Sequence, residues 1–378
     1  MSDTPLPSLR WRHGNRFRLH VDGGALFPAM LHAIAAAERQ ILLEMYLVES
    51  GRTFDRFAAA LGAAAQRGVR VCLLLDAFGC LGLSAADRDR LCEAGIELRL
   101  YNPLRFGGAL RRNLFRDHRK LLVIDNRCAF VGGAGITDPF DPDNDAEHYW
   151  HDVMVEISGP LVADWQAVFA HNWARWSPAP ITVDAAVART GDQAGRCTLA
   201  GPDTRSTVKR SLLARITGAR QRIWLATAYF VPSWKLRRRL ARAARRGVDV
   251  RLLLPGPITD HPAVRHAGRR FYRRLLQAGV RIYEYQPRFQ HAKIALIDDW
   301  VAVGSSNLDR WNLRWNLEAN QEIDAPDFAA ETRALFAADF ANSMEYDIEV
   351  WRRRPHRSRV AERFWGSIDR WVDRYSRR

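Results

Sequence analysis

Lysine and long apolar runs are both scarce in this chain of 378 residues. Of the 57 basic residues, 53 are arginine, and the lysines are only Lys120, Lys209, Lys235 and Lys293. The most apolar stretch, 25–37, is interrupted by Pro28 and His32, so nothing approaches the roughly 18 apolar residues of a membrane span. The first residues also lack the charged start and apolar run of a signal peptide. Because lysine is so rare in this chain, any lysine that lies in a sequence motif needs an explanation.

Cysteine is also sparse, with five residues that show no paired metal-type spacing. An odd number without such pairs is typical of reduced, mostly buried thiols in a cytosolic chain and not of a disulfide framework. His148 and His151 lie three positions apart, but no neighbouring residues complete a set of zinc ligands. The sequence thus predicts no metal and no cofactor.

The composition nevertheless describes a well-folded protein with an anionic partner. With 47% hydrophobic and 26% charged residues, the chain can bury substantial cores, and its length favours two domains. A formal net charge of +15 and a pI near 10.3 favour nucleic acid, a phospholipid surface or a small phosphorylated substrate as partner. Charge alone leaves these three open.

An internal repeat organises the chain. Three segments of the first half, each a short apolar run with similar flanking residues, recur in the same order in the second half; the pairs are 39–46 with 222–229, 66–75 with 245–254, and 94–103 with 278–287. Gly68 and Gly247 stand where a helix should end before a strand. Each half therefore reads strand, helix, strand, helix, strand and a further apolar run, which predicts α/β domains with helices on both faces of their sheets.

This repeat gives the predicted domain boundaries. They are a first α/β domain at 1–178, a linker at 179–195, a second α/β domain at 196–342, and a basic amphipathic tail at 343–378.

The two halves share the motif His-x-Lys-x-x-x-x-Asp, at equivalent places in the repeat. Chance predicts roughly 0.01 occurrences in a chain of this composition, yet the pattern occurs twice and uses two of the four lysines; its members are His118, Lys120 and Asp125, and His291, Lys293 and Asp298. Side chains at i and i+2 of a strand share one face. We therefore expect each histidine and its lysine to project together toward one site.

Two imidazoles and two ammonium groups in one pocket suit phosphodiester transfer. One neutral imidazole can attack phosphorus to form a phosphohistidine, while the other protonates the departing alkoxide and later deprotonates the incoming alcohol or water. The lysines would stabilise the charge on the non-bridging oxygens without a metal ion. The residues alone do not decide which histidine is the nucleophile.

The duplicated motif resembles that of the phospholipase D superfamily, and the resemblance covers both repeats. It implies two pseudo-symmetric phospholipase D-like α/β/α domains with the active site at their interface, His118 as nucleophile and His291 as acid. More local stretches resemble bacterial cardiolipin synthases without N-terminal transmembrane helices, namely 11–19, 28–44, 64–68, 73–79, 115–120 and 155–160. That resemblance implies transfer of a phosphatidyl group between two molecules of phosphatidylglycerol, with release of glycerol.

Small-residue turns follow each motif, at 132–135 and 304–307. Their backbone N–H groups are suited to approach phosphate oxygens, which makes substrate-binding candidates of Gly133, Gly135, Ser305 and Ser306. The family pattern has a phosphate-donating Asn at the fourth position. The second half matches it with Asn307, whereas Gly135 departs from it in the first half.

Acidic residues are expected to orient the two histidines and fix their tautomers. Asp152 and Glu322 each precede apolar strand residues and are the candidates for this role. Asp125 and Asp298 complete the catalytic motifs, and we expect them to tie strand ends together by ion pairs.

The first half carries an insertion at 104–114 that mixes apolar residues with arginine. Arg111 and Arg112 are candidate substrate-binding residues if the insertion docks on a membrane; a plain solvated loop is the alternative. For Trp311 and Trp315 the sequence allows two locations equally, either packed in a core or lining the mouth of a lipid-binding site.

The sequence thus predicts a cardiolipin synthase-like phosphatidyltransferase, peripheral on the inner face of a bacterial cell membrane, with phospholipid substrates and an anionic membrane surface as partner. The alternatives are a phospholipase D-type hydrolase and a nuclease or phosphodiesterase, for which nucleic acid would be the partner. A catalytically silent binding module is disfavoured because both motifs are intact.

Overall fold

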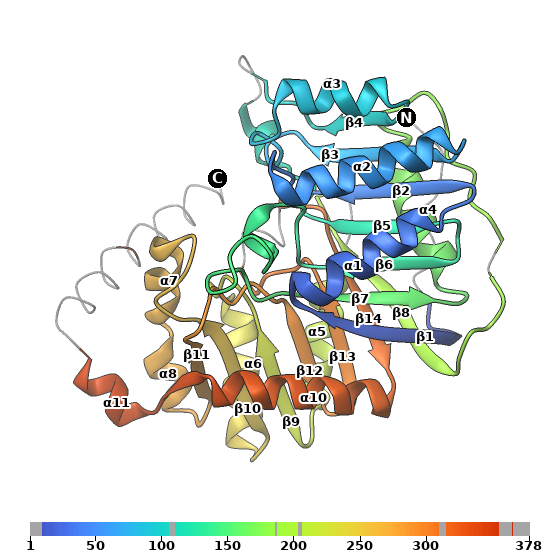
Figure 1. Ribbon diagram of the computed structural model, residues 1–378. Helices are drawn as coiled ribbons and strands as arrows, with labels where there is room; N and C mark the ends of the chain where they lie inside the picture. The colour runs from blue at the N-terminus through green and yellow to red at the C-terminus, as the bar shows by residue number, and fades with distance from the viewer. Residues whose placement is uncertain are drawn as a thin grey trace.

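A computed structural model describes residues 10–105, 110–185, 187–202, 206–309, 315–354 and Trp365. Figure 1 shows two stacked α/β halves, the first in blue to green and the second in yellow to red. The elements of the two halves follow the same order, as the repeat predicted.

The first half contains seven strands, β1–β7, among the described residues. Its elements are β1 (Arg12–Val21), α1 (Asp22–Ala35), β2 (Gln40–Met45), α2 (Arg52–Gln66), β3 (Arg70–Asp76), α3 (Ala85–Glu93), β4 (Glu97–Tyr101), the 3₁₀ helix η1 (Leu110–Leu114), β5 (Lys120–Ile124), β6 (Cys128–Gly132), η2 (Asp138–Phe140), β7 (Val153–Ser158) and α4 (Val162–Trp173).

The second half repeats this order and adds an edge strand, β15. Its elements are β8 (Gln193–Ala200), α5 (Thr207–Gly218), β9 (Arg222–Ala226), α6 (Trp234–Arg245), β10 (Asp249–Pro255), α7 (Pro262–Arg269), α8 (Tyr272–Leu276), β11 (Arg281–Tyr285), β12 (Ile294–Ile297), β13 (Trp300–Gly304), β14 (Glu318–Asp324), α10 (Pro326–Ala341), β15 (Ser343–Tyr346) and α11 (Ile348–Arg353).

The sheets of the two halves join into one mixed sheet of fifteen strands. Its order is β15-β11-β10-β9-β12-β13-β14-β8-β1-β7-β6-β5-β2-β3-β4. Reading outward from the antiparallel pair β1 and β8, the two halves place equivalent strands in the same sequence, as a pseudo-two-fold axis requires. In each half the first crossover strands are parallel, and the strand that follows the His-x-Lys motif is antiparallel to its neighbour.

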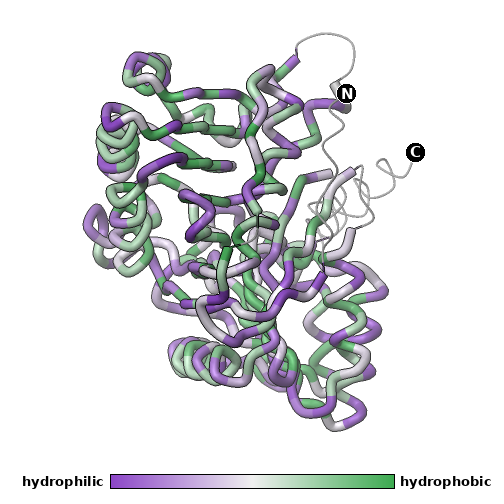
Figure 2. The backbone as a smooth tube through the Cα atoms, turned by 90° about the vertical axis from the view of Figure 1, so that its right-hand side faces the viewer, coloured by the Kyte–Doolittle hydropathy of each residue, from purple (hydrophilic) through white to green (hydrophobic). Residues whose placement is uncertain are grey.

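Alternate residues of each strand enter different cores, which shows that both sheet faces are covered. On β2, Ile41 and Leu43 pack with the residues of α1, α2 and α3, whereas Leu42 lies in a central core with those of α4. On β9, Leu225 packs with the residues of α5 and α6, and Trp224 joins the central core with those of α10. Figure 2 shows the apolar segments gathered in the interior, with the most hydrophilic ones toward the outside. The predicted fold class is confirmed.

The glycines predicted to end helices do so through a left-handed backbone. Gly68 and Gly247 have φ of 88° and 89°, a region that side chains with a Cβ rarely adopt. In both halves the following valine donates its N–H to a carbonyl of the last helical turn, Val69 to Ala64 at 3.1 Å and Val248 to Ala243 at 3.2 Å. This closure turns the chain directly from helix into strand.

Two element boundaries differ from the predicted domain limits. Strand β8 begins at Gln193, inside the segment predicted as linker, because residues 193–195 pair with β1. Beyond Asn342, β15 pairs antiparallel with β11, and the Trp351 side chain of α11 is buried in the second-half core. Residues 343–354 therefore continue the second half, and the rest of the predicted tail, 355–378, lies outside the described residues except for Trp365.

No helix among the described residues is long and apolar enough to cross a membrane. All five cysteines are free thiols, and Cys72, Cys80 and Cys197 are buried.

Candidate active site

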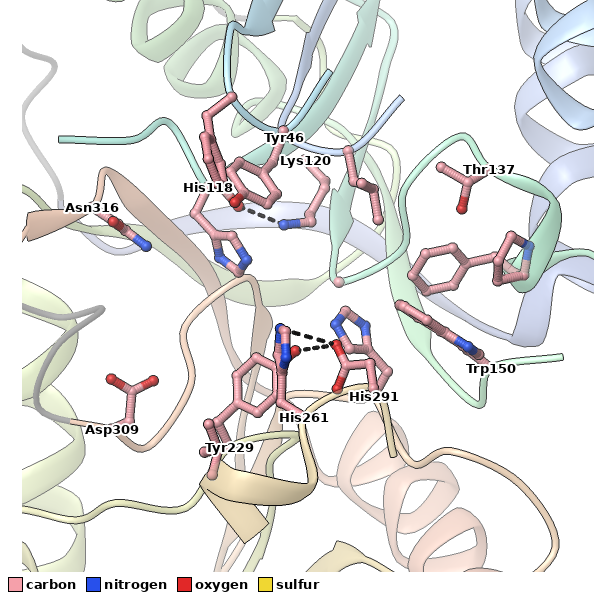
Figure 3. Close-up of a pocket in the computed structure, with 18 of the residues that line it drawn as sticks. Tyr46, His118, Lys120, Thr137, Trp150, Tyr229, His261, His291, Asp309 and Asn316 are labelled. Atoms are coloured by element: carbon pink, nitrogen blue, oxygen red, sulfur yellow. Dashed lines mark hydrogen bonds and ion pairs between the residues drawn. The ribbon is translucent and has the colours of Figure 1, made fainter. Parts of the chain in front are cut away.

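Both motifs open into one cavity of about 800 Å³ between the two halves. His118 and Lys120 line it from the first half, and His291 lines it from the second (Figure 3). The two histidine side chains are almost fully buried, with 8% and 5% of their residue surfaces exposed. In the first half, Lys120 is the first residue of β5 and His118 precedes the strand. In the second half, both His291 and Lys293 precede β12.

The first histidine is oriented by a carboxylate of the other half. His118 Nδ1 lies 3.1 Å from Glu318 Oε2, and Glu318 is completely buried at the start of β14. A neutral imidazole that donates Nδ1–H to this carboxylate keeps the lone pair on Nε2 for chemistry. The Lys120 Nζ donates to the backbone oxygen of His118 at 2.8 Å and lies 5.0 Å from the Tyr46 ring centre.

The second histidine is oriented by a carboxylate of the first half. His291 Nδ1 lies 2.5 Å from Asp152 Oδ2, and Asp152 is 2% exposed immediately before β7. Lys293 Nζ donates to the backbone oxygen of His291 and also lies 2.8 Å from its Nδ1. Each half therefore supplies one histidine and the acid that orients the histidine of the other half.

Short parallel bridges between the halves hold this exchange in place. His118 donates its backbone N–H to Leu317 at 3.0 Å, directly before Glu318. In the same way, His291 donates to the backbone oxygen of His151 at 2.8 Å, directly before Asp152. Each histidine is thus tied by its backbone to the segment that carries its carboxylate.

His151 is a structural cation at this crossing. Its Nδ1 lies 2.7 Å from Asp22 Oδ1 and its Nε2 lies 3.2 Å from Asp339 Oδ2. Burial opposes the charged form, but the two carboxylates outweigh it and raise the pKa of His151 to about 10.

Among the described residues, no group of three His, Cys, Asp or Glu side chains forms a possible metal site.

Burial is the largest cause that lowers the pKa of each basic group in the pocket. Burial, followed by repulsion from Lys293, lowers the pKa of Lys120 to about 7, and burial lowers that of Lys293 to about 8. Burial and then Lys293 lower the pKa of His291 to about 4, and burial also lowers the pKa of His118. A bound phosphodiester anion would raise these pKa values, because a nearby opposite charge favours the protonated forms.

Asn307 and Gly135 occupy equivalent turns but differ in their surroundings. Asn307 is fully buried, and its Oδ1 accepts from Thr227 Oγ1 at 3.1 Å and from the Tyr229 N–H at 3.2 Å. Its Nδ2 has no hydrogen-bond partner among the described residues, and so it keeps an unused amide donor. At Gly135 a Cβ atom would lie 2.7 Å from the Leu47 carbonyl oxygen, which explains why the first half has no side chain there.

The other turn residues support the carboxylates. Ser305 Oγ donates to Glu318 Oε2, and the Ala319 N–H donates back to Ser305 Oγ at 3.1 Å. Gly133 lines the cavity, and a Cβ there would lie 2.4 Å from Asp152 Oδ1. The Ser306 hydroxyl is buried without a hydrogen-bond partner. Of these predicted substrate-binding residues, Ser305 serves Glu318 and Gly133 makes room for Asp152.

The motif aspartates bind backbone rather than forming the predicted ion pairs. Asp125 accepts the N–H groups of residues 38, 39 and 40 at 2.8 Å. Asp298 accepts those of residues 220, 221 and 222 at 2.9–3.1 Å. Both have positive φ, 54° and 52°, a turn conformation that Asp tolerates better than most residues. They fix the ends of the motif strands to the start of β2 and β9, away from the pocket.

Glu322 does not reach either histidine, which is contrary to the predicted role. Its carboxylate accepts from Arg196 Nε at 2.9 Å and from Trp300 Nε1 at 3.3 Å. The acid that orients His118 is Glu318, four residues earlier. The signal that identifies it is its place as the first residue of β14, which matches the place of Asp152 directly before the equivalent strand β7.

The insertion contributes no described side chain to the cavity wall. The side chain of Arg111 lies outside the described residues, and Arg112 is exposed without lining the cavity. Trp311 also lies outside them, whereas the Trp315 ring packs 5.5 Å from that of Phe115.

A bilobal α/β fold with two crosswise-oriented His-x-Lys pairs defines an enzyme of the phospholipase D superfamily. A family model described as "Cardiolipin synthase, PLD-like domain" matches residues 30–173 and 212–340, most of the chain. The chain is 38% identical over 318 residues to cardiolipin synthase B of Salmonella typhi, covering 82% of this chain and 76% of that protein. It is 35% identical over 341 residues to cardiolipin synthase A of Pseudomonas aeruginosa (strain LESB58), covering 89% and 69%. The chain belongs to this cardiolipin synthase family.

A solved structure shows the same fold at much lower sequence identity. The crystal structure of phosphatidylserine synthase from Haemophilus influenzae Rd KW20 superimposes with a TM-score of 0.71 at 12% identity, covering 94% of this chain and 93% of that one. This likeness supports the fold alone.

Proposed function

We propose that the protein transfers a phosphatidyl group from one phosphatidylglycerol to another through a phosphohistidine on His118, with release of glycerol. The observation that carries the proposal is the crosswise pairing of His118 with Glu318 and of His291 with Asp152 in one cavity, in a chain of the cardiolipin synthase family.

In the first step, His118 Nε2 attacks phosphorus as the bond to the glycerol oxygen breaks. That oxygen takes a proton from His291, and the phosphatidyl group remains on His118. In this proposal Lys120, Lys293 and the Asn307 amide stabilise the non-bridging oxygens. In the second step, His291 removes a proton from the hydroxyl of the second phosphatidylglycerol, its oxygen bonds to phosphorus, and the P–N bond to His118 breaks.

The cavity mouth supports a lipid substrate. Phe78 and Leu81 line it from the loop after β3 and are 50% and 64% exposed. On the second half, Ile258 lies in the equivalent loop after β10 and Trp234 begins α6; neither lines the cavity, and they are 40% and 59% exposed. Large apolar side chains around a mouth, in a chain with a net charge of +15, suit an anionic bilayer surface. We infer a peripheral enzyme at the inner face of the cell membrane.

An apolar mouth also explains how transfer can prevail over hydrolysis. One phosphodiester replaces another, so the reaction is close to isoenergetic, and water competes with the acceptor hydroxyl for the phosphohistidine. Apolar residues that line the cavity, including Leu47, Phe140 and Trp150, disfavour bulk water near the intermediate.

The test is to incubate the purified protein separately with phosphatidylglycerol vesicles and with single-stranded DNA, and to identify the products by mass spectrometry. We expect cardiolipin and glycerol from the vesicles. Phosphatidic acid as the sole lipid product would favour a hydrolase, and nucleotide fragments without lipid products would favour a nuclease; either result overturns the proposal.

A further inference from the structure

The two walls of the cavity differ in chemistry at equivalent places in the two halves. In the loops that follow β2 and β9, equivalent positions hold Leu47 in the first half and Tyr229 in the second, and both line the cavity. At this position the pseudo-symmetric fold thus presents an apolar side chain on one wall and a hydroxyl on the other.

The loops after β3 and β10 repeat this difference. The first-half loop lines the cavity with Phe78 and Leu81, and the second-half loop lines it with Asp260 and His261. Figure 3 shows Tyr229, His261 and Asp309 on the side opposite Tyr46 and Lys120. At both pairs of loop positions the first half is therefore apolar and the second half polar, although Tyr46, Glu49 and Thr137 of the first half also line the cavity.

The polar wall is held in a fixed arrangement. The Tyr229 hydroxyl donates to Asp260 Oδ2, and His261 Nε2 lies 3.7 Å from the same oxygen. The Tyr229 and His261 rings lie 5.6 Å apart. The backbone N–H of Tyr229 is held at 3.2 Å by the buried Asn307, which ties this wall to the turn that follows the second motif.

The charge of this wall does not suit a phosphate group. This wall carries two carboxylates, Asp260 and Asp309, and the described lining of the cavity contains no arginine, although the chain contains 53. Asp309 is only 5% exposed. A carboxylate repels a phosphodiester but accepts hydrogen bonds from hydroxyl groups, and charged acceptors form the stronger bonds.

The polar wall lies on the side where the alcohol must be. His291, which exchanges a proton with the departing and attacking oxygen in the proposed function, belongs to the same half as Tyr229, Asp260 and His261. We propose that these residues and Asp309 form a subsite for the polyhydroxy alcohol that leaves and attacks, while the diacylglycerol part lies along the Leu47 and Phe78 wall.

This subsite deepens the proposed function and rests on it. In the second step, the acceptor's attacking hydroxyl gives its proton to His291 Nε2 and its oxygen forms the bond to phosphorus, while the P–N electron pair returns to His118. A neighbouring hydroxyl of the same alcohol donates to Asp260. An alcohol with a single hydroxyl lacks this second contact, so the subsite selects polyols by affinity for the acceptor.

The experiment compares acceptors in the intact enzyme. Phosphatidylglycerol vesicles are supplied with deuterated glycerol, ethanol or ethanolamine, and kcat/KM for each phosphatidyl-alcohol product is measured by mass spectrometry. We expect Asp260→Asn to lower the glycerol-to-ethanol ratio of kcat/KM about 10- to 100-fold, the loss of one hydrogen bond to a charged group. Asp309→Asn should lower it as well.

Glu49→Gln is the matched control, because it removes a carboxylate from the opposite wall of the same cavity. It should change the ratio by less than about twofold, and retained transfer to ethanol shows that each variant is folded. An unchanged ratio in Asp260→Asn overturns the subsite, as does a wild-type preference for ethanolamine that Asp260→Asn abolishes. A wild-type enzyme that forms no cardiolipin from phosphatidylglycerol alone overturns the proposed function itself.

Discussion

The two catalytic histidines share a fold position but have contrasting surroundings. Beneath His118 lies a buried polar network, in which Asn172 Nδ2 donates to Glu44 at 2.9 Å and to Asp117 at 2.7 Å. Arg119 donates to Glu44 at 3.2 Å. The equivalent positions beside His291 hold neutral residues, Ala226, Gln290 and Ala292.

The second histidine instead lies in an aromatic cage. The ring centres of Phe140, Trp150 and Phe289 lie 5.4, 5.2 and 5.4 Å from that of His291, whereas His118 contacts the Tyr46 ring at 4.7 Å. Apolar rings oppose a charged imidazole, which agrees with the lowering of the His291 pKa to about 4 by burial and Lys293.

This contrast indicates a division of labour. A polar network fixes the backbone around His118. This suits a nucleophile, because its attacking nitrogen must approach phosphorus along one direction. An apolar cage makes the proton on His291 depend on a bound anion, so His291 can donate readily to a leaving oxygen. Four predictions test this difference, in order of decreasing expected effect.

Replacing the nucleophile should have the largest effect. His118→Asn is expected to lower phosphatidyl transfer by at least about 10⁴-fold and to abolish the covalent adduct, because no imidazole remains to attack phosphorus. His291→Asn should accumulate the adduct, since the second step lacks its base. Mass spectrometry of the intact protein after rapid quenching with lipid reads both outcomes. His148→Asn, at an exposed position, is the control, and an adduct that persists in His118→Asn would assign the nucleophile to the other half.

Removing the orienting charge should cost about 10³- to 10⁴-fold. Glu318→Gln keeps the size of the side chain but allows the wrong tautomer of His118, and the corresponding change in the serine-protease triad costs about 10⁴-fold. Steady-state transfer assays compare it with Glu322→Gln, which is expected to change activity less than about twofold once folding is verified by thermal melting. Equal losses in the two variants would show that Glu318 acts only through stability.

The same pair of residues shows what the sequence can predict. The repeat, the motifs and the glycine ends of α2 and α6 are local patterns, and they predicted the element order and fold class. Asp152 was recognisable because it stands directly before an apolar strand. Glu318 was missed because β14 reads Glu-Ala-Asn-Gln-Glu-Ile-Asp, and only the register with β8 and β13 shows that Glu322 pairs with Arg196. Each half also supplies the acid that orients the histidine of the other half, and His118 and Glu318 stand 200 positions apart in the sequence. Such a contact is likewise a tertiary feature.

The lysines should give a smaller loss and a shift in pH dependence. Lys120 binds the anion only when protonated, and its pKa is lowered to about 7, so kcat/KM should fall as the pH rises above that value. It should also fall in acid, below the lowered pKa of His118, because the nucleophile must be neutral. Lys120→Arg, which stays charged, should lose roughly 10-fold at pH 6.5 and move the alkaline limb upward. An alkaline limb that stays in place in Lys120→Arg would assign that limb to another group.

The cavity mouth should give the smallest effect and separate its two sides. If diacylglycerol lies along the first-half wall, Phe78→Ser with Leu81→Ser should weaken co-sedimentation with anionic vesicles about 10-fold, because roughly one large side chain of apolar burial is lost. Trp234→Ser on the second-half side should weaken it about threefold. Val183→Ser, at an exposed position between the halves, serves as the matched control and should leave binding unchanged. Equal losses on the two sides would mean that the membrane contacts both halves to the same extent. The apolar first-half wall would then contact the substrate but would not be the main membrane-binding surface.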